Sequence, residues 1–242
     1  MRILITNDDG IESESLRLLA KWARKHGEVT IVAPKIEQSG RSQGIDIIHP
    51  FSVEEVYIDE GIRAYSVDST PADCVRFAIL GMHEKPDLVI SGINRGYNLG
   101  RDIAYSGTVG AIFEAKGLGV KALALSTAHA SYDNAIAHLD EIYAFVEGNK
   151  LFEYCDLWNI NVPKDEVKGI NLTCQGGAYY LDEFIRMDDG KYYQKGIFVF
   201  ENKNDMTLDT DSVMAGYISL TPLTLEKTDL SAYEKIKNVI GE

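Results

Sequence analysis

The sequence has few cysteines. Only Cys74, Cys155 and Cys174 occur in its 242 residues, and no two of them form a CxxC pair. An odd number of widely spaced cysteines excludes a disulfide framework and gives no zinc-binding pattern. Cys74 lies in a predicted helix, where a buried thiol is the ordinary interpretation. We therefore expect neither disulfide bonds nor a zinc site in this chain.

The chain is also short of positive charge. Lys and Arg total 24 against 37 Asp and Glu, which gives a formal net charge of -13. Because this charge repels polyanions, we expect neither a nucleic acid polymer nor an anionic membrane among its partners. A small phosphorylated substrate would need cations at its own binding site.

Long apolar runs are lacking too. No stretch is long enough to span a bilayer, and the apolar run at the N-terminus stops at Asn7, which is too short for a signal peptide. There is no repeat, flexible linker or low-complexity segment. With 45% hydrophobic and 25% charged residues, the composition is that of a globular domain with a sizeable core. We predict a soluble cytoplasmic protein.

Strands and helices alternate through most of the sequence. Apolar runs typical of buried strands are followed by stretches with helical periodicity, and this order predicts a mostly parallel sheet covered by helices on both faces. The predicted fold is therefore a Rossmann-like, three-layer α/β sandwich. Strands are predicted at 3–6, 29–33, 87–92, 122–126 and 158–162, and helices at 14–26, 70–82, 106–116 and 134–146.

Two segments depart from this alternation. Residues 45–67 are short apolar pieces broken by proline, glycine and charges, which predicts a β-hairpin. Residues 169–200 lose the helical period and are rich in aromatics, which predicts a β extension that serves either as an interaction surface or as cover for the chain's own core. A strand at 217–220 and a helix at 229–240 follow. We interpret 1–242 as one domain, with a core at 1–165 and the remaining elements at 166–242.

Two adjacent carboxylates follow the first predicted strand. The side chains of Asp8 and Asp9 repel each other unless a cation lies between them or each has its own hydrogen-bond donors. The pair therefore indicates a site for a hard divalent cation. The ordinary alternative is that Asp8 caps the next helix and that Asp9 is solvated.

Ser39 and Asn94 come after two later predicted strands. Because ligands of an open parallel sheet bind beyond the carboxyl ends of its strands, we expect both residues to meet Asp8 and Asp9 at one edge. Two anionic and two neutral oxygen ligands suit Mg²⁺ or Mn²⁺ and do not suit zinc or copper. The sequence thus predicts one divalent metal ion bound by these four residues.

The segment Ser106-Gly107-Thr108 opens a predicted helix. Its hydroxyls and unpaired backbone N–H groups lie at the positive end of the helix dipole, an arrangement that binds phosphate, although such a tripeptide is more often a plain helix cap. Arg41, Arg95 and Arg101 lie in neighbouring predicted loops and offer positive charge, or are merely solvated. Asp102 precedes the segment, where it either donates a proton or pairs with Arg101.

Several ordered motifs together resemble one known family. They are Ile-Thr-Asn-Asp-Asp-Gly at 5–10, Val-Ala-Pro at 32–34 followed by Ser39, Thr-Pro-Ala-Asp-Cys at 70–74, Ser-Gly-Ile-Asn-Arg-Gly at 91–96 and Tyr-Ser-Gly-Thr-Val at 105–109. This set is similar to the survival protein SurE family of 5'/3'-nucleotidases. Similarity at 159–163 and 216–222 extends the resemblance over nearly the whole chain.

The resemblance implies a metal-dependent phosphomonoesterase that acts on nucleoside 5'- and 3'-monophosphates; some family members also cleave short polyphosphate. Asp8, Asp9, Ser39 and Asn94 occupy the positions that bind one Mg²⁺ or Mn²⁺ per subunit, and phosphate would lie over Ser106, Gly107 and Thr108. Asp8, Asp9, Asn94 and Asp102 are accordingly our catalytic candidates, with Arg95 and Ser39 also near the phosphate. The family further implies a homodimer or homotetramer that exchanges the β extension and the C-terminal segment.

One departure from the family concerns histidine. Related proteins often carry a catalytic histidine after the last strand, whereas no histidine follows His138 here. A histidine acid is therefore not expected. Either Asp102, our candidate for proton transfer, or a metal-bound water that acts with little proton help must carry more of the chemistry.

Two other functions fit part of the pattern. Asp8 or Asp9 would be the nucleophile of a haloacid-dehalogenase-type phosphatase, but those enzymes use Asp-x-Asp rather than adjacent acids. A metal- or nucleotide-binding sensor resembling a receiver domain would explain the acidic pair without catalysis. Receiver domains are much shorter, and their phosphoacceptor Asp follows the third core strand, where this chain has Asn94.

Overall fold

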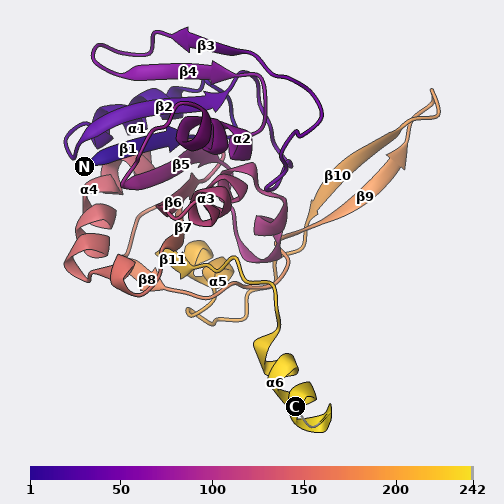
Figure 1. Cartoon of the computed structure of the whole chain (residues 1–242). Coiled ribbons are helices and arrows are strands. Elements are labelled where there is room, and N and C mark those ends of the chain that lie inside the picture. Colours follow the sequence, from indigo (N-terminus) through magenta and orange to yellow (C-terminus); the bar gives the residue numbers. More distant parts are fainter. Residues whose placement is uncertain (241–242) are drawn as a thin grey trace.

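The computed structural model describes residues 1–240, and its centre is a nine-stranded sheet in the order β3-β4-β2-β1-β5-β6-β7-β11-β8 (Figure 1). The β3–β4 and β7–β11 pairs are antiparallel, and the other neighbours run parallel. The mostly parallel sheet is therefore confirmed. The strands are β1 (Arg2–Thr6), β2 (Glu28–Pro34), β3 (Val53–Val56), β4 (Arg63–Val67), β5 (Leu88–Arg95), β6 (Lys121–Thr127), β7 (Leu157–Val162), β8 (Ile170–Leu172) and β11 (Ile218–Pro222).

Helices cover both faces of this sheet because its strands present apolar side chains alternately to each side. In β1, Ile3 and Ile5 join a core with α1 and α4, while Leu4 joins a second core with α2 and α3. The three-layer prediction is therefore confirmed. The helices are α1 (Glu14–Ala23), α2 (Pro71–Arg76), α3 (Gly107–Gly117), α4 (Asp133–Gly148), α5 (Asp209–Met214) and α6 (Leu230–Ile240), with 3₁₀ turns at Gly100–Tyr105 and Leu151–Glu153.

Two helices end earlier than the periodicity predicts. α1 stops at Ala23 rather than at residue 26, because Lys25 and His26 donate their N–H groups three residues back and tighten the last turn. The helix predicted at 70–82 is α-helical only to Arg76. It then widens into one π-helical turn, in which Met82 N–H reaches the carbonyl of Phe77 at 2.8 Å.

Both segments that depart from the alternation form β structure, the predicted hairpin over 53–67 and the predicted extension over 170–198. In the first, β3 pairs antiparallel with β4, which joins the central sheet. In the second, β9 (Tyr180–Arg186) and β10 (Tyr192–Phe198) form a separate hairpin that projects from the body (Figure 1). The arms of this hairpin are exposed throughout, whereas Tyr179 at its root is buried against Leu99 and Val213. The root therefore covers the chain's own core, and the arms do not.

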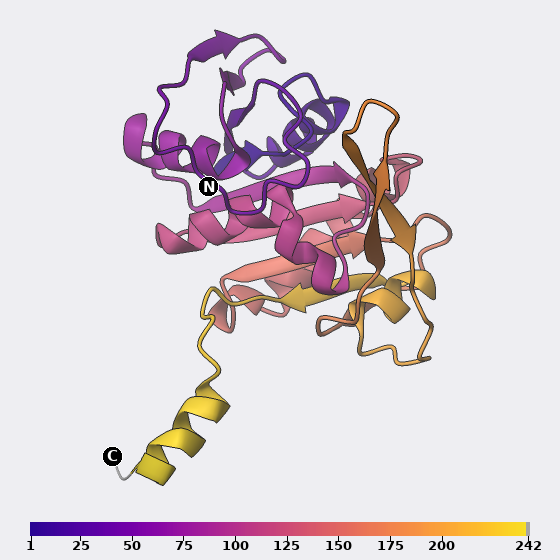
Figure 2. The same cartoon turned by 90° about the vertical axis from the view of Figure 1, so that its right-hand side faces the viewer.

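Of the last elements of the chain, β8 and β11 belong to the central sheet, whereas α6 is exposed to solvent. β8 and β11 extend the central sheet beyond β7, so the sheet takes strands from both sides of residue 165. α6 lies well away from the body (Figure 2), and none of its residues is buried. No helix within residues 1–240 is long and apolar enough to cross a membrane.

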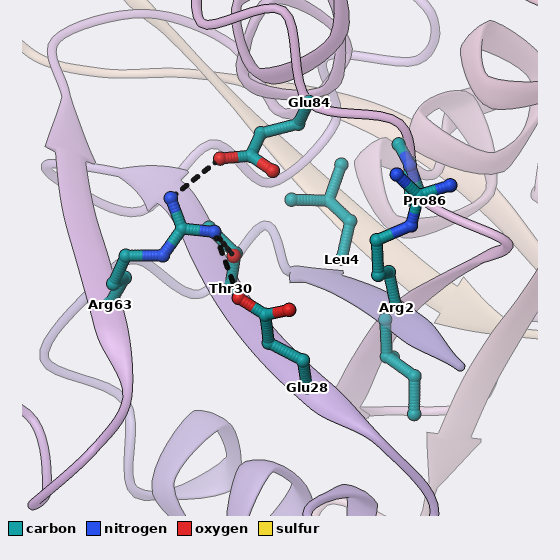
Figure 3. A pocket seen from close by; sticks show the side chains of 8 residues that line it. Arg2, Leu4, Glu28, Thr30, Arg63, Glu84 and Pro86 are labelled. Carbon is teal, nitrogen blue, oxygen red and sulfur yellow. Dashed lines mark hydrogen bonds and ion pairs between the residues drawn. The ribbon is translucent and has the colours of Figure 1, made fainter.

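Ion pairs close the amino-terminal edge of the sheet (Figure 3). The guanidinium of Arg63 donates to Glu84 at 2.7 Å, to the Thr30 hydroxyl at 3.0 Å and to Glu28 at 3.5 Å. The carboxylate of Glu84 raises the pKa of Arg63. Since this guanidinium already has anionic partners, the edge offers little to a ligand, and the opposite, carboxyl edge is where the candidate site lies.

Candidate functional site

Asp8 lies just beyond the end of β1, where it is only 4% exposed. Burial raises the pKa of its carboxyl group, and the Thr108 hydroxyl, which donates to Oδ1 at 2.6 Å, opposes that rise. A Cβ on Gly107 would lie 2.9 Å from the Asp8 Cβ, so only glycine lets the first turn of α3 approach this closely. The structure thus brings the predicted metal and phosphate segments into contact.

Asp9 is the least satisfied carboxylate of the site. Its Oδ2 is buried and has no hydrogen-bond partner within the part of the chain that the structure describes. Burial, and secondly the charge of Asp8, raise the pKa of Asp9 to about 6, while the backbone N–H of Arg95 lowers it. An ionised pair here costs free energy that a cation would offset.

Asn94 follows a bulge near the carboxyl end of β5, the strand that pairs with β1. The pairing of β5 with β6 shifts between Ser91 and Asn94, and a Cβ on Gly92 would lie 2.3 Å from the Leu125 carbonyl oxygen. Only glycine permits this bulge, which re-aims the residues that follow. The Asn94 Nδ2 donates to the Gly96 carbonyl at 2.8 Å, so its Oδ1 is left to accept or to coordinate.

Ser39 is carried by the loop after β2. The loop is fixed where Gln38 N–H donates to the backbone oxygen of Asp8 at 2.7 Å. The Ser39 hydroxyl donates to Glu37 at 2.7 Å, and Ser39 lines the same cleft as Asp9 and Arg95. Glu37, which the sequence did not single out, adds a negative charge that further raises the pKa of Asp9.

These donors fit a hard divalent cation. No group of three or more His, Cys, Asp or Glu side chains is arranged as a metal cluster among residues 1–240. The predicted set consists instead of two carboxylates, one amide and one hydroxyl, which are oxygen ligands suited to Mg²⁺ or Mn²⁺. The unpartnered buried oxygen of Asp9 is the structural observation that favours an ion here.

The predicted phosphate segment does begin a helix. The Ser106 Oγ accepts the N–H of Val109 at 3.1 Å and caps α3, which is the ordinary role of a serine at this position. The Thr108 hydroxyl donates its hydrogen bond to Asp8 Oδ1. Arg95 is exposed, lines the cleft with Asp9, and places its guanidinium 5.2 Å from the ring centre of Tyr132.

Asp102 faces a different cleft. It lies in the 3₁₀ turn Gly100–Tyr105, and its Oδ2 accepts the backbone N–H of Tyr180 at the hairpin root at 2.8 Å. Burial raises the pKa of this carboxyl group. Among the described residues its hydrogen-bond partner is Tyr180, and the alternative of pairing with Arg101 is not seen. Ser39 lines both this cleft and that of Asp9.

Comparison with known proteins decides the family. The family model described as Survival protein SurE matches residues 3–182. The chain belongs to the SurE family. A 5'-nucleotidase SurE from Alkaliphilus metalliredigens is 39% identical over 99% of this chain and 98% of its own, and one from Legionella pneumophila is 34% identical over 100% and 98%. The crystal structure of the SurE protein from Aquifex aeolicus superposes with a TM-score of 0.78 at 31% identity, covering 99% of both chains.

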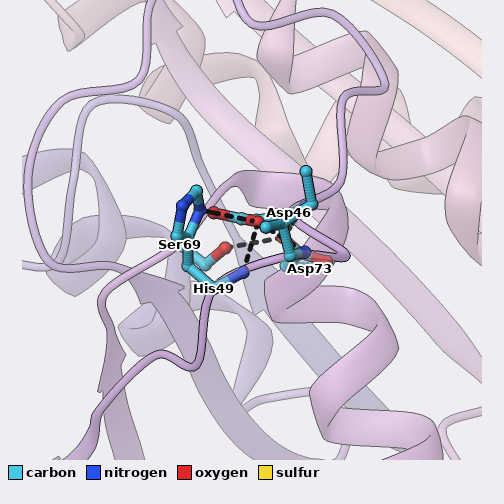
Figure 4. Close-up of polar contacts among 5 residues, drawn as sticks. Asp46, His49, Ser69 and Asp73 are labelled. Atoms are coloured by element: carbon cyan, nitrogen blue, oxygen red, sulfur yellow. Dashed lines mark hydrogen bonds and ion pairs between the residues drawn. The ribbon is translucent and has the colours of Figure 1, made fainter.

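In this SurE-family chain, the motif at 70–74 does more than begin a helix (Figure 4). Thr70 caps α2 by accepting the N–H of Asp73 at 3.1 Å. Asp73 Oδ2 in turn accepts the N–H of Asp46 at 2.8 Å and the Ser69 hydroxyl at 2.6 Å. The carboxylate of Asp46 then binds Nδ1 of His49 at 3.0 Å. These bonds fasten the loop that follows Ser39, a role that helix-capping signals alone do not reveal.

Proposed function

We propose that this SurE-family chain is a divalent-metal-dependent phosphomonoesterase that releases phosphate from nucleoside 5'- and 3'-monophosphates and from short polyphosphate, in the cytoplasm. The observation that supports it best is the unpartnered Asp9 oxygen, next in sequence to Asp8, whose own side chain contacts the N-terminal turn of α3. The names of the relatives, 5'-nucleotidase SurE, agree with this chemistry.

Each residue has a defined task in this proposal. Asp8, Asp9, Ser39 and Asn94 would hold one Mg²⁺ or Mn²⁺ per subunit. When bound, the ion supplies charge that stabilises the phosphoryl group and activates water for attack. The first turn of α3, Ser106-Gly107-Thr108, orients the phosphate through its N-terminal dipole, and the guanidinium of Arg95 adds positive charge on the Asp9 side.

Asp102 is the proposed proton donor to the leaving nucleoside oxygen. Its raised pKa favours the protonated form, and the cleft that it lines begins at Ser39. We expect Asp102→Asn to lower kcat for AMP about 100-fold and to leave kcat for p-nitrophenyl phosphate nearly unchanged, since nitrophenolate departs without a proton. Steady-state rates for both substrates test this. Equal losses for the two substrates would show that Asp102 is not the acid.

Phosphate release is the direct test of the proposed function. The protein should release phosphate from 5'- and 3'-nucleoside monophosphates with Mn²⁺ or Mg²⁺, and this release should stop with a chelator and return when the metal is restored. A phosphate assay over a panel of bases, with tripolyphosphate included, ranks the substrates. Metal and nucleotide binding by calorimetry without any release would favour a non-enzymatic sensor, and a trapped phosphoenzyme would favour an aspartyl nucleophile.

We also propose that the chain forms a homodimer or homotetramer through its projecting elements. α6 exposes Leu230, Tyr233 and Ile236 by 64%, 51% and 57%, and the arms of the β9–β10 hairpin expose aromatic and aliphatic side chains. Apolar surface on two elements that leave the body is best explained by burial against another copy. Removal of residues 226–242 should shift the particle mass measured by light scattering toward the monomer.

A further inference from the structure

One carboxylate beside the proposed metal site has no task so far. Glu37 lies in the loop after β2, two residues before Ser39, and lines the same cleft as Asp9. Its Oε1 accepts the hydrogen of the Ser39 hydroxyl at 2.7 Å. If the proposed function is correct and Ser39 is a ligand of the divalent ion, this hydrogen bond acts directly on a metal ligand.

The main chain of this loop is held against the acidic pair. The N–H of Gln38 donates to the backbone oxygen of Asp8 at 2.7 Å. On the other side, a Cβ on Gly10 would lie 3.2 Å from the backbone of Ile36 and 3.4 Å from that of Glu37, and Gly10 has a φ of 98°, which favours glycine. The backbone on both sides of the Glu37 carboxylate is therefore fixed in place.

The direction of the hydrogen bond decides what the Ser39 hydroxyl can do. A serine hydroxyl has one hydrogen to donate and two lone pairs that accept or coordinate. Because the carboxylate of Glu37 takes the hydrogen, the lone pairs stay available to a cation, and the O–H does not point at it. Partners that bind metal ligands in this way orient the ligand and raise its basicity.

Two other roles for Glu37 have less support. It is not arranged as a third carboxylate ligand, since no three His, Cys, Asp or Glu side chains within residues 1–240 are grouped to hold a metal ion. Attraction by charge alone is shared with Glu12, another exposed carboxylate of this cleft, whereas the bond to Ser39 belongs to Glu37. We propose that Glu37 is a positioning residue, which orients the Ser39 hydroxyl for the divalent ion.

Titration calorimetry with Mn²⁺ alone tests this role without relying on turnover. Glu37→Ala should weaken Mn²⁺ binding about 10- to 100-fold. Glu37→Gln, whose side-chain oxygen still accepts the Ser39 hydrogen, should weaken it by less than about fivefold. Glu12→Ala is the matched control, because it removes a charge from the same cleft, and it should stay within the same limit.

A double-mutant cycle separates positioning from charge. Because the proposed effect passes through Ser39, Glu37→Ala should change Mn²⁺ affinity by less than about fivefold when Ser39 is already Ala. An undiminished loss in the Ser39→Ala background would show that Glu37 acts as a ligand or a charge of its own and would overturn the inference. Equal losses for Glu37→Ala and either Glu37→Gln or Glu12→Ala would do the same.

Failure of the proposed function would look different. An unchanged protein that binds no Mn²⁺ would contradict the proposed metal site itself, and the role of Glu37 would fall with it. An unchanged protein that binds Mn²⁺ and releases phosphate, with a Glu37→Ala variant that binds the ion equally well, would contradict the role of Glu37 alone.

Discussion

Replacing Asp9 by Asn is expected to lower kcat/KM for AMP about a thousandfold, which corresponds to ~4 kcal/mol of lost transition-state stabilisation. Asn keeps the size of the side chain but removes the negative charge that the cation would need. The buried Oδ2 of Asp9, which has no protein partner among residues 1–240, is the atom whose role this variant tests. Rates with saturating Mn²⁺ and a calorimetric titration of Mn²⁺ measure the two effects separately.

The same variant should stabilise the metal-free protein. Because burial raises the folded-state pKa of Asp9 to about 6 from 3.8, this group favours folding fully below pH 3.8, and that contribution is lost as the pH rises through 6. At pH 7 a neutral Asn avoids the cost. We expect the melting temperature without metal to rise by about 2–4 °C, of order 1 kcal/mol after solvent screening is allowed for, and to change little at pH 4.

Asp46→Asn is a control with the opposite sign. Hydrogen bonds from the backbone N–H groups of His49 and Ile48 lower the pKa of Asp46 to about 2, so its ionised form favours folding above pH 3.8. This variant should lower the melting temperature at pH 7. If Asp9→Asn also lowered it, or retained turnover with unchanged metal affinity, the assignment of Asp9 as a charge-bearing metal ligand would be wrong.

The sequence could predict the sheet and the position of the acidic pair because both depend on local order. A buried apolar run that stops at Asp8 places this residue at a strand end, and parallel strands share one carboxyl edge. The bulge that turns Asn94 is harder to predict, since a glycine within a strand has several explanations. The need for glycine at position 92 comes from the carbonyl of Leu125 in β6, and no local sequence pattern reveals this contact.

Contacts between segments that are far apart in the sequence cannot be predicted either, because no local pattern reveals them. Asp102 precedes the phosphate segment, yet the structure joins it to Tyr180, 78 residues away. Asp73 lies at the start of a predicted helix, but its bond to Asp46 depends on the path of an irregular loop. Loops have no periodicity, so the contacts that fix them appear only when the fold is known.

The second large effect is expected from substitution of Gly110 in α3, and it concerns the stability of the fold. An added Cβ there would lie 2.0 Å from the carbonyl oxygen of Ser42 and 2.7 Å from the backbone nitrogen of Gln43. Gly→Ala within a helix ordinarily stabilises a protein by about 0.5–1 kcal/mol. Here the methyl group meets backbone, so we expect Gly110→Ala to lower the free energy of unfolding by about 1–3 kcal/mol.

Gly148, the last residue of α4, is the matched control. A Cβ there would have no atom within 4 Å, so Gly148→Ala should be neutral or slightly stabilising. Urea unfolding of both variants measures the difference. If Gly110→Ala were as stable as Gly148→Ala, the close packing of α3 against the loop would be contradicted.

The loss at Gly110 should extend to activity, because the contacted loop cannot simply move aside. On its other side, Ser42 donates its N–H to Tyr105 at 3.0 Å and its hydroxyl to Ala104 at 2.7 Å. A methyl group that pushes Ser42 therefore shifts either the 3₁₀ turn or the loop that carries Ser39. We expect Gly110→Ala to lower kcat/KM for AMP at temperatures where the variant is fully folded, whereas Gly148→Ala leaves it unchanged. Loss of stability without loss of activity would show that the loop adjusts locally and that Ser39 does not depend on its position.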